Sequence, residues 1–101
     1  MYYVYILRCI DYSLYTGITT DYKRRYHEHI TGVGAKYTKS HKPISIEALF
    51  TCKSRKEASI LEYAIKQLSK EMKEKLIQDK DLSILNSIDI SLYKSVDLII
   101  L

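Results

Sequence analysis

The stretch "YYVYILRCIDYSLYTGIT" (residues 2–19) contains two β-strand patterns separated by turn residues. Residues 2–9 are β-branched and aromatic, which predicts a well-buried strand. The letters "IDYS" favour a turn, and residues 14–19 then predict the second strand of a hairpin. Gly17 interrupts this second strand, and a glycine inside a strand often marks a bulge or a close approach to the backbone.

The residues after the hairpin predict a helix, a basic loop, a third strand and a long helix. Asp21 is a favourable N-cap for a helix over residues 22–30, and Gly32 lies where a left-handed C-cap is expected. Residues 44–52 alternate between apolar and polar, which is typical of a strand. The capping box "SRKE" (54–57) opens a long helix, whose apolar positions recur at steps of three and four residues.

These elements, in the order β-β-α-β-α, predict a small α+β fold in which a three-stranded antiparallel sheet is flanked by helices. The long helix is expected to pause near Ser69 and to resume as far as Gln78. At 101 residues the chain fits one domain, which we place at residues 1–78. Residues 79–101 form a C-terminal extension that is apolar enough to pack but has no pattern from which to assign structure.

The positive charge of the chain is concentrated in its N-terminal half. The formal net charge is +4. Residues 1–56 carry ten Lys/Arg and four Asp/Glu, whereas residues 57–101 carry six and eight. A basic half indicates a polyanionic partner such as nucleic acid, although many small domains are mildly basic without binding one.

The cysteine and hydropathy patterns exclude several classes of protein. Cys9 and Cys52 are far apart and lack the spacing of zinc ligands, so we expect two buried, reduced thiols. The N-terminus has no signal-peptide pattern, and no apolar run approaches the roughly 18 residues of a membrane span. We therefore expect a cytoplasmic protein that has no membrane partner.

Tyr5 and Tyr15 are the first candidate functional residues. A hairpin loop of three residues (11–13) would place Tyr15 opposite Cys9 and on the same face of the sheet as Tyr5, at an offset of four residues or roughly 13 Å. A loop one residue longer or shorter would put the two rings on opposite faces. The alternative without a function is a pair of half-buried strand tyrosines.

Arg25 and His29 lie four residues apart on the predicted helix and therefore share one of its faces. The planar fork of an arginine suits phosphate oxygens. A histidine beside it could hydrogen-bond a nucleophile or exchange protons near neutral pH. The plainer interpretation is a solvated basic helix face.

Glu62 lies about 80° from the centre of the apolar stripe of the long helix, where its carboxylate could face a cleft beside the sheet. It could ligate Mg²⁺, which commonly takes one or two carboxylates and completes its coordination with water and phosphate. It could equally pair with Lys66 at i,i+4.

The loop of residues 32–43 interleaves basic and aromatic side chains. This mixture suits contacts with a nucleic-acid backbone and stacking on bases, and it is equally compatible with a solvated loop. The candidate nucleic-acid-binding residues are Lys36, Tyr37, Lys39 and Lys42.

Taken together, these motifs resemble those of the GIY-YIG nuclease family. "VYI" (4–6) and "YTG" (15–17), whose tyrosines lie ten residues apart, are similar to the paired motif of the family. The first motif reads Val-Tyr-Ile rather than Gly-Ile-Tyr, so the catalytic tyrosine of the family corresponds to Tyr5. "GVGAKYT" and the short length look most like the small stand-alone bacterial members.

The rest of the resemblance lies in the two predicted helices. Arg25 and His29 follow Tyr15 by ten and fourteen residues and match the helix residues of the family. Glu62 lies in "EASILEYAIK", which is similar to the segment that carries the metal-binding glutamate of the family.

The resemblance implies a divalent-metal-dependent endonuclease that hydrolyses phosphodiester bonds in DNA. The cutting would be structure-selective or weakly sequence-selective, since contacts to phosphate carry no direct sequence information. A role in DNA repair, recombination or processing would follow.

In this reading Glu62 holds one Mg²⁺ or Mn²⁺ ion on the scissile phosphate. Tyr5 orients or deprotonates the attacking water, and His29 helps it to do so. Arg25 neutralises the charge that builds up on the phosphate, and Tyr15 bonds to a phosphate oxygen or to the nucleophile. The glycine of the second strand lets the backbone come close to this cluster.

Two hypotheses from other classes compete with the nuclease. One is a catalytically silent nucleic-acid-binding module, which would bind DNA in a salt-dependent way without cutting it. The other is an interaction domain that forms a homodimer through its apolar tail, residues 80–101.

Overall fold

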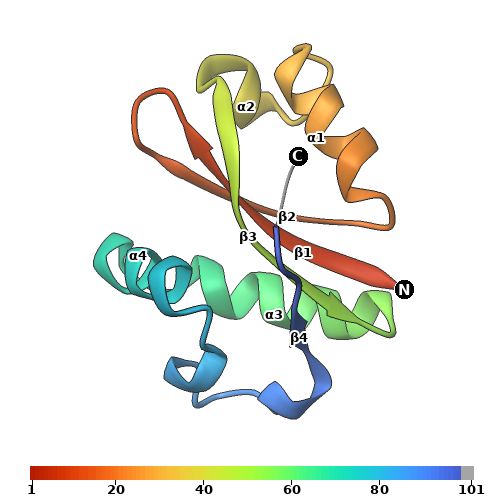
Figure 1. The fold of residues 1–101 in the computed structure, drawn as a ribbon, viewed down its shortest axis with the longest axis vertical. Helices are drawn as coiled ribbons and strands as arrows, with labels where there is room; N and C mark the ends of the chain where they lie inside the picture. The colour runs from red at the N-terminus through yellow and green to blue at the C-terminus, as the bar shows by residue number, and fades with distance from the viewer. Residues whose placement is uncertain (99–101) are drawn as a thin grey trace.

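The computed structural model describes residues 1–98. Its elements are β1 (Tyr2–Cys9), β2 (Leu14–Thr19), α1 (Tyr22–Ile30), α2 (Lys36–Ser40), β3 (Pro43–Cys52), α3 (Arg55–Lys66), α4 (Lys70–Asp79), two 3₁₀ turns (Leu82–Ile84 and Ile90–Leu92) and β4 (Lys94–Ser95). Helices α1 and α2 lie on one side of the sheet, and α3 and α4 lie on the other (Figure 1). Within these residues no helix has the length and apolar character needed to cross a membrane.

Within the described residues the sheet is antiparallel and has four strands in the order β2-β1-β3-β4. The α+β class is therefore confirmed, and the prediction of three strands was wrong by one. The added strand β4 pairs with β3 through Phe50 opposite Ser95 and Thr51 opposite Lys94. Two residues are too few to produce a readable alternation, which is why the strand escaped prediction. The last three residues of the predicted extension, 99–101, lie outside the described residues.

The hairpin of β1 and β2 has a different register from the predicted one. Tyr15 lies opposite Leu7, and Gly17 lies opposite Tyr5. The predicted pairing of Tyr15 with Cys9 was therefore wrong by two residues. A shift of two preserves the face on which each side chain lies, so Tyr5 and Tyr15 share a face and their offset falls from four residues to two.

Local sequence signals explain where the helices begin and end. The Asp21 carboxylate accepts a hydrogen bond from the Arg24 amide and caps α1, and the Ser54 hydroxyl accepts one from the Glu57 amide and caps α3. The predicted pause is confirmed, because α3 ends at Lys66 and α4 begins at Lys70. Gly32 adopts φ +86°, the left-handed conformation expected after α1.

The two faces of the sheet carry two separate apolar clusters. One packs the sheet against α3, α4 and the C-terminal segment, and its members include Val4, Ile6, Phe50, Leu61, Ile65, Leu76, Leu82 and Tyr93. The other packs the sheet against α1 and includes Tyr5, Leu7, Leu49, Tyr15, Tyr22 and Tyr26. Cys9 and Cys52 are buried free thiols, as predicted.

Candidate active site

Tyr5 lies in the middle of β1 and extends its ring over the neighbouring strand. Its cross-strand partner is Gly17 of β2. A Cβ atom added at Gly17 would lie only 2.4 Å from the Tyr5 hydroxyl oxygen. Gly17 therefore allows the close approach that its position in the strand predicted, and the tyrosine hydroxyl reaches the side of the sheet covered by α1.

His29, in the last turn of α1, meets this hydroxyl. Its Nε2 atom lies 2.8 Å from the Tyr5 oxygen, and both side chains are buried. The imidazole is held against the backbone of the following loop, because a Cβ atom at Gly34 would lie 2.4 Å from Nδ1 and 2.8 Å from the Cα of His29. Sequence reasoning missed Gly34, although the letters "GVGAK" placed it inside the predicted basic loop of residues 32–43.

The other imidazole nitrogen of His29 meets a residue that sequence reasoning also missed. Nδ1 lies 2.7 Å from Oγ1 of Thr38, and that hydroxyl lies 2.9 Å from the carbonyl oxygen of Ala35. Thr38 is buried on the inner side of α2. No feature of the sequence singled out this threonine, because its burial arises only when α2 packs against α1.

Tyr15 and Arg25 complete the α1 side of the candidate site. The Tyr15 ring centroid lies 6.4 Å from that of Tyr5 and 5.3 Å from that of His29. The charge of Arg25 acts directly on Tyr5, whose pKa it lowers. The guanidinium is about one-third exposed and forms a 3.0 Å ion pair with Glu28. Arg25 is therefore within reach of both the buried pair and solvent.

Glu62 approaches from the opposite layer of the molecule. It lies on α3, which packs across β2 and β1 from the other side of the sheet. Its charge contributes to the raised pKa of Tyr5, but only as the last of several effects, of which burial is the largest. Glu62 also pairs with Lys66, with 3.3 Å between Oε2 and Nζ. The helix ion pair is therefore present, and the role of Glu62 as a metal ligand stays a prediction.

Burial dominates the electrostatics of the Tyr5–His29 pair. Desolvation raises the pKa of Tyr5 to about 12, against the opposing effect of Arg25. Desolvation, followed by the charge of Arg25, lowers the pKa of His29 to about 4. Both groups are therefore neutral at pH 7, which suits a hydrogen bond between a phenol and an imidazole.

The predicted nucleic-acid-binding residues lie on and just after α2, next to this pair. Their side chains are exposed, and they are Lys36, Tyr37, Lys39 and Lys42. The Tyr37 ring stacks on Tyr15, at 5.7 Å between centroids, and on His41 at 4.1 Å. Tyr37 thus connects the basic loop to the candidate site through ring contacts, and its binding of nucleic acid stays a prediction.

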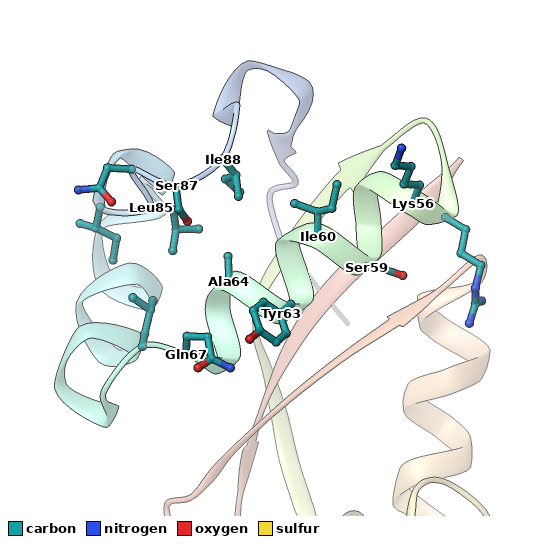
Figure 2. Close-up of a pocket in the computed structure, with 13 residues that line it drawn as sticks. Lys56, Ser59, Ile60, Tyr63, Ala64, Gln67, Leu85, Ser87 and Ile88 are labelled. Carbon is teal, nitrogen blue, oxygen red and sulfur yellow. The ribbon is translucent and has the colours of Figure 1, made fainter.

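The structure also has a hollow that lies away from these residues. It has a volume of about 920 Å³ and lies between α3 and the segment after α4, where Ile60, Tyr63 and Leu85 face it (Figure 2). Its lining includes none of the candidate residues named above. Since its walls are mainly apolar, it lacks the groups that hydrolysis of a phosphodiester requires.

Comparison with known proteins identifies the family. Residues 1–75 match the family model described as "GIY-YIG catalytic domain". The chain belongs to the GIY-YIG family. The match includes both strand motifs and both helices that carry the candidate residues, so the resemblance inferred from "VYI" and "YTG" is confirmed.

Several small proteins that carry the name UPF0213 are similar to this chain along most of its length. A UPF0213 protein of Fusobacterium nucleatum is 52% identical over 80 residues, which are 79% of this chain and 80% of the relative. A UPF0213 protein of Halobacterium salinarum is 46% identical over 76 residues, 75% of this chain and 99% of the relative. A solution NMR structure is known of a UPF0213 protein from Bacillus halodurans whose sequence is 43% identical to this one. The two structures superpose with a TM-score of 0.52, and the match covers 90% of this chain and 98% of the Bacillus chain.

Proposed function

We propose that this GIY-YIG protein is a divalent-metal-dependent endonuclease that hydrolyses phosphodiester bonds in nucleic acid, with DNA as the expected substrate. The observation that carries the proposal is the 2.8 Å contact between the Tyr5 hydroxyl and His29 Nε2, in a site where the charges of Arg25 and Glu62 both act on the tyrosine. A nucleophile activator, a phosphate-binding cation and a metal-binding carboxylate are the groups that this chemistry needs.

The donor set suits a hard cation. Among residues 1–98 no group of three or more His, Cys, Asp or Glu side chains could hold a metal ion. Glu62 would supply a carboxylate ligand, and the other positions of Mg²⁺ or Mn²⁺ would be filled largely by water and phosphate oxygens. When bound, the ion would polarise the scissile phosphate and stabilise the leaving oxygen.

Tyr5 and His29 would remove the proton of the attacking water in one relay. With a pKa of about 12, Tyr5 has little phenolate at neutral pH. It therefore gives its own proton to His29 Nε2 as it takes one from the water. A bound phosphate would favour this transfer, because it offsets the positive charge of Arg25 that helps to hold down the pKa of His29.

The surrounding residues would bind the substrate by its backbone. Arg25 would neutralise the negative charge that develops on the phosphate, and Tyr15 would hydrogen-bond a phosphate oxygen or the nucleophile. The exposed lysines of the α2 region would hold neighbouring phosphates. Such contacts carry no direct sequence information, so we expect structure-selective or weakly sequence-selective cutting, and with it a role in DNA repair, recombination or processing.

Cleavage assays with Tyr5→Phe and Glu62→Ala test the proposal. We expect the wild-type protein to cleave only in the presence of Mg²⁺ or Mn²⁺, and each variant to lose at least about 10²-fold in kcat. The control Tyr12→Phe removes the same hydroxyl from a ring that is 73% exposed in the hairpin loop and should keep full activity. Equal activity of the wild type and Glu62→Ala would indicate a contaminating nuclease or a wrong metal ligand.

The substrate panel comprises single-stranded, duplex and branched DNA together with RNA. A preferred structure would appear as a difference in kcat/KM across the panel at constant salt. Binding to every substrate without any cleavage would overturn the nuclease and favour the catalytically silent binding module.

A further inference from the structure

We propose that Thr38 is a positioning residue that selects the tautomer of His29 and so makes Nε2 the atom that accepts the Tyr5 hydrogen bond. The consequence of this inference for catalysis rests on the proposed nuclease function. The tautomer itself follows from contacts among buried groups and can be measured without any substrate.

The direction of the hydrogen bonds follows from counting protons. A threonine hydroxyl has one hydrogen to donate and can accept as well. The Thr38 hydroxyl lies 2.9 Å from the Ala35 carbonyl oxygen, which can only accept, so its hydrogen is used there. The same oxygen lies 2.7 Å from His29 Nδ1 and must act as the acceptor in that contact. Nδ1 of His29 therefore carries a hydrogen.

The protonation state of the second imidazole nitrogen, Nε2, follows from that of Nδ1. A neutral imidazole has one N–H and one lone pair, so a hydrogen on Nδ1 leaves the lone pair on Nε2. The Tyr5 hydroxyl, 2.8 Å away, donates to that lone pair. In the opposite tautomer the Thr38 hydroxyl would have to turn its hydrogen toward Nδ1 and give up its bond to the Ala35 carbonyl oxygen.

The fold keeps Thr38 in this position. Thr38, His29 and Tyr5 are between 1 and 3% exposed, so water does not compete for their hydrogen bonds. The Thr38 hydroxyl donates to the carbonyl oxygen of Ala35, the N-cap residue of α2, a local contact that threonine can form with the carbonyl three positions earlier. Gly34 leaves the room that lets the imidazole lie against this turn.

This arrangement has the form of a base oriented by a third group. When Tyr5 gives its proton to Nε2, His29 becomes an imidazolium with donors on both nitrogens. The Nδ1–H then continues to donate to Thr38, and no group has to turn during the transfer. A neutral hydroxyl rather than a carboxylate orients the histidine. Thr38 therefore sets the direction of the hydrogen bonds of His29 without adding a charge.

The first test reads the tautomer directly. Long-range ¹H–¹⁵N spectra distinguish protonated from unprotonated imidazole nitrogens, and we expect wild-type His29 and Thr38→Ser to carry hydrogen on Nδ1. Thr38→Val keeps the shape but has no acceptor, so it should shift His29 toward the Nε2–H form. The control Thr20→Val removes an exposed hydroxyl and should leave the spectrum unchanged. An Nε2–H tautomer in the wild type, or an unchanged tautomer in Thr38→Val, would overturn the proposal.

The second test measures the catalytic consequence. We expect Thr38→Val to lower kcat about 10²-fold while KM for the nucleic acid stays within about twofold, and Thr38→Ser to restore kcat. A rise in KM at constant kcat would contradict a positioning role and indicate substrate binding instead. If no protein cleaves any nucleic acid while the spectra show the expected tautomers, the proposed function fails and the assignment of Thr38 stands.

Discussion

At the level of single residues, the buried Tyr5 hydroxyl and the buried Nε2 atom of His29 are hydrogen-bond partners of each other. Both side chains are almost completely shielded from water. Among the residues that the structure describes, no buried side-chain nitrogen or oxygen lacks a partner. An unmatched buried polar group costs about 1–3 kcal/mol. The pair is therefore maintained by the penalty of separating it as well as by the hydrogen bond itself.

The lowered pKa of His29 predicts that the protein loses stability in mild acid. Its pKa is about 4 in the folded state and 6.5 in the unfolded chain, so the unfolded chain binds more protons between these values. The free energy of unfolding should fall as the pH falls from about 6.5 to about 4, by as much as about 3 kcal/mol from this group. Urea unfolding at several pH values measures the change.

The control for this pH dependence is His29→Gln, which cannot titrate at this position. Its stability should vary less with pH over the same window, whatever its absolute value. His27, His41 and the carboxylates remain in both proteins, so their contributions cancel in the comparison. Equal slopes for the two proteins would show that another group dominates the acid response.

At the level of elements, the loop between α1 and α2 determines how the helices place their polar groups. It turns within residues 31–35, so that His29 at the end of one helix meets Thr38 on the next. Two glycines enable this turn for different reasons. Gly32 supplies a positive φ, whereas Gly34 supplies space against His29.

These two glycines provide a matched pair of variants. Gly34→Ala would place a Cβ atom 2.8 Å from the backbone of His29, so the loop must shift. We expect a loss of about 1–3 kcal/mol in stability, as for other overpacked sites, together with a clear loss of cleavage. Urea unfolding and initial cleavage rates measure both effects.

Gly32→Ala is the control within the same loop. A Cβ atom there meets nothing within 4 Å, but the residue has φ +86°. The expected result is a loss of about 1 kcal/mol from backbone strain, with activity retained because the site is not displaced. Equal effects of the two variants on activity would contradict the role of Gly34 as the space beside His29.

At the level of the whole molecule, the candidate site draws on both layers of helices. Tyr15, Arg25 and His29 come from β2 and α1, whereas Glu62 comes from α3 on the other side of the sheet (Figure 1). The basic surface of α2 lies beside the first group. A phosphodiester bound between α1 and α2 would contact basic side chains and the Tyr5–His29 pair at the same time.

The distribution of charge predicts which lysines bind nucleic acid. Changing Lys36, Lys39 and Lys42 to Gln should lower the slope of log K against log salt by about 2 to 3, because each phosphate contact contributes about 0.7 to 0.9. Changing Lys56, Lys73 and Lys75 to Gln alters the net charge equally, but on α3 and α4. Fluorescence anisotropy over a salt series measures the affinity of both triple variants for nucleic acid. Equal salt slopes for the two variants would exclude a specific role for the α2 lysines.

The sequence by itself determined the local elements of this protein. Caps, turn residues and apolar periodicity depend on neighbours within a few positions, and the boundaries of α1 and the pause after α3 could be read from them. The motif spacing of Tyr5 and Tyr15, with the helix residues that follow, was also sufficient to indicate the family. β4 could not be predicted, since two residues carry no pattern.

Only the tertiary structure decided which groups meet. The hairpin register, the burial of Thr38 beside His29 and the room left by Gly34 each depend on contacts between different elements. So does the pKa of Tyr5, which is raised chiefly by burial between the sheet and the helices. Spacing along the chain indicates which face of a strand or helix a side chain occupies. The distance between two side chains, their shielding from water and the direction of their hydrogen bond are set only when separate elements pack together.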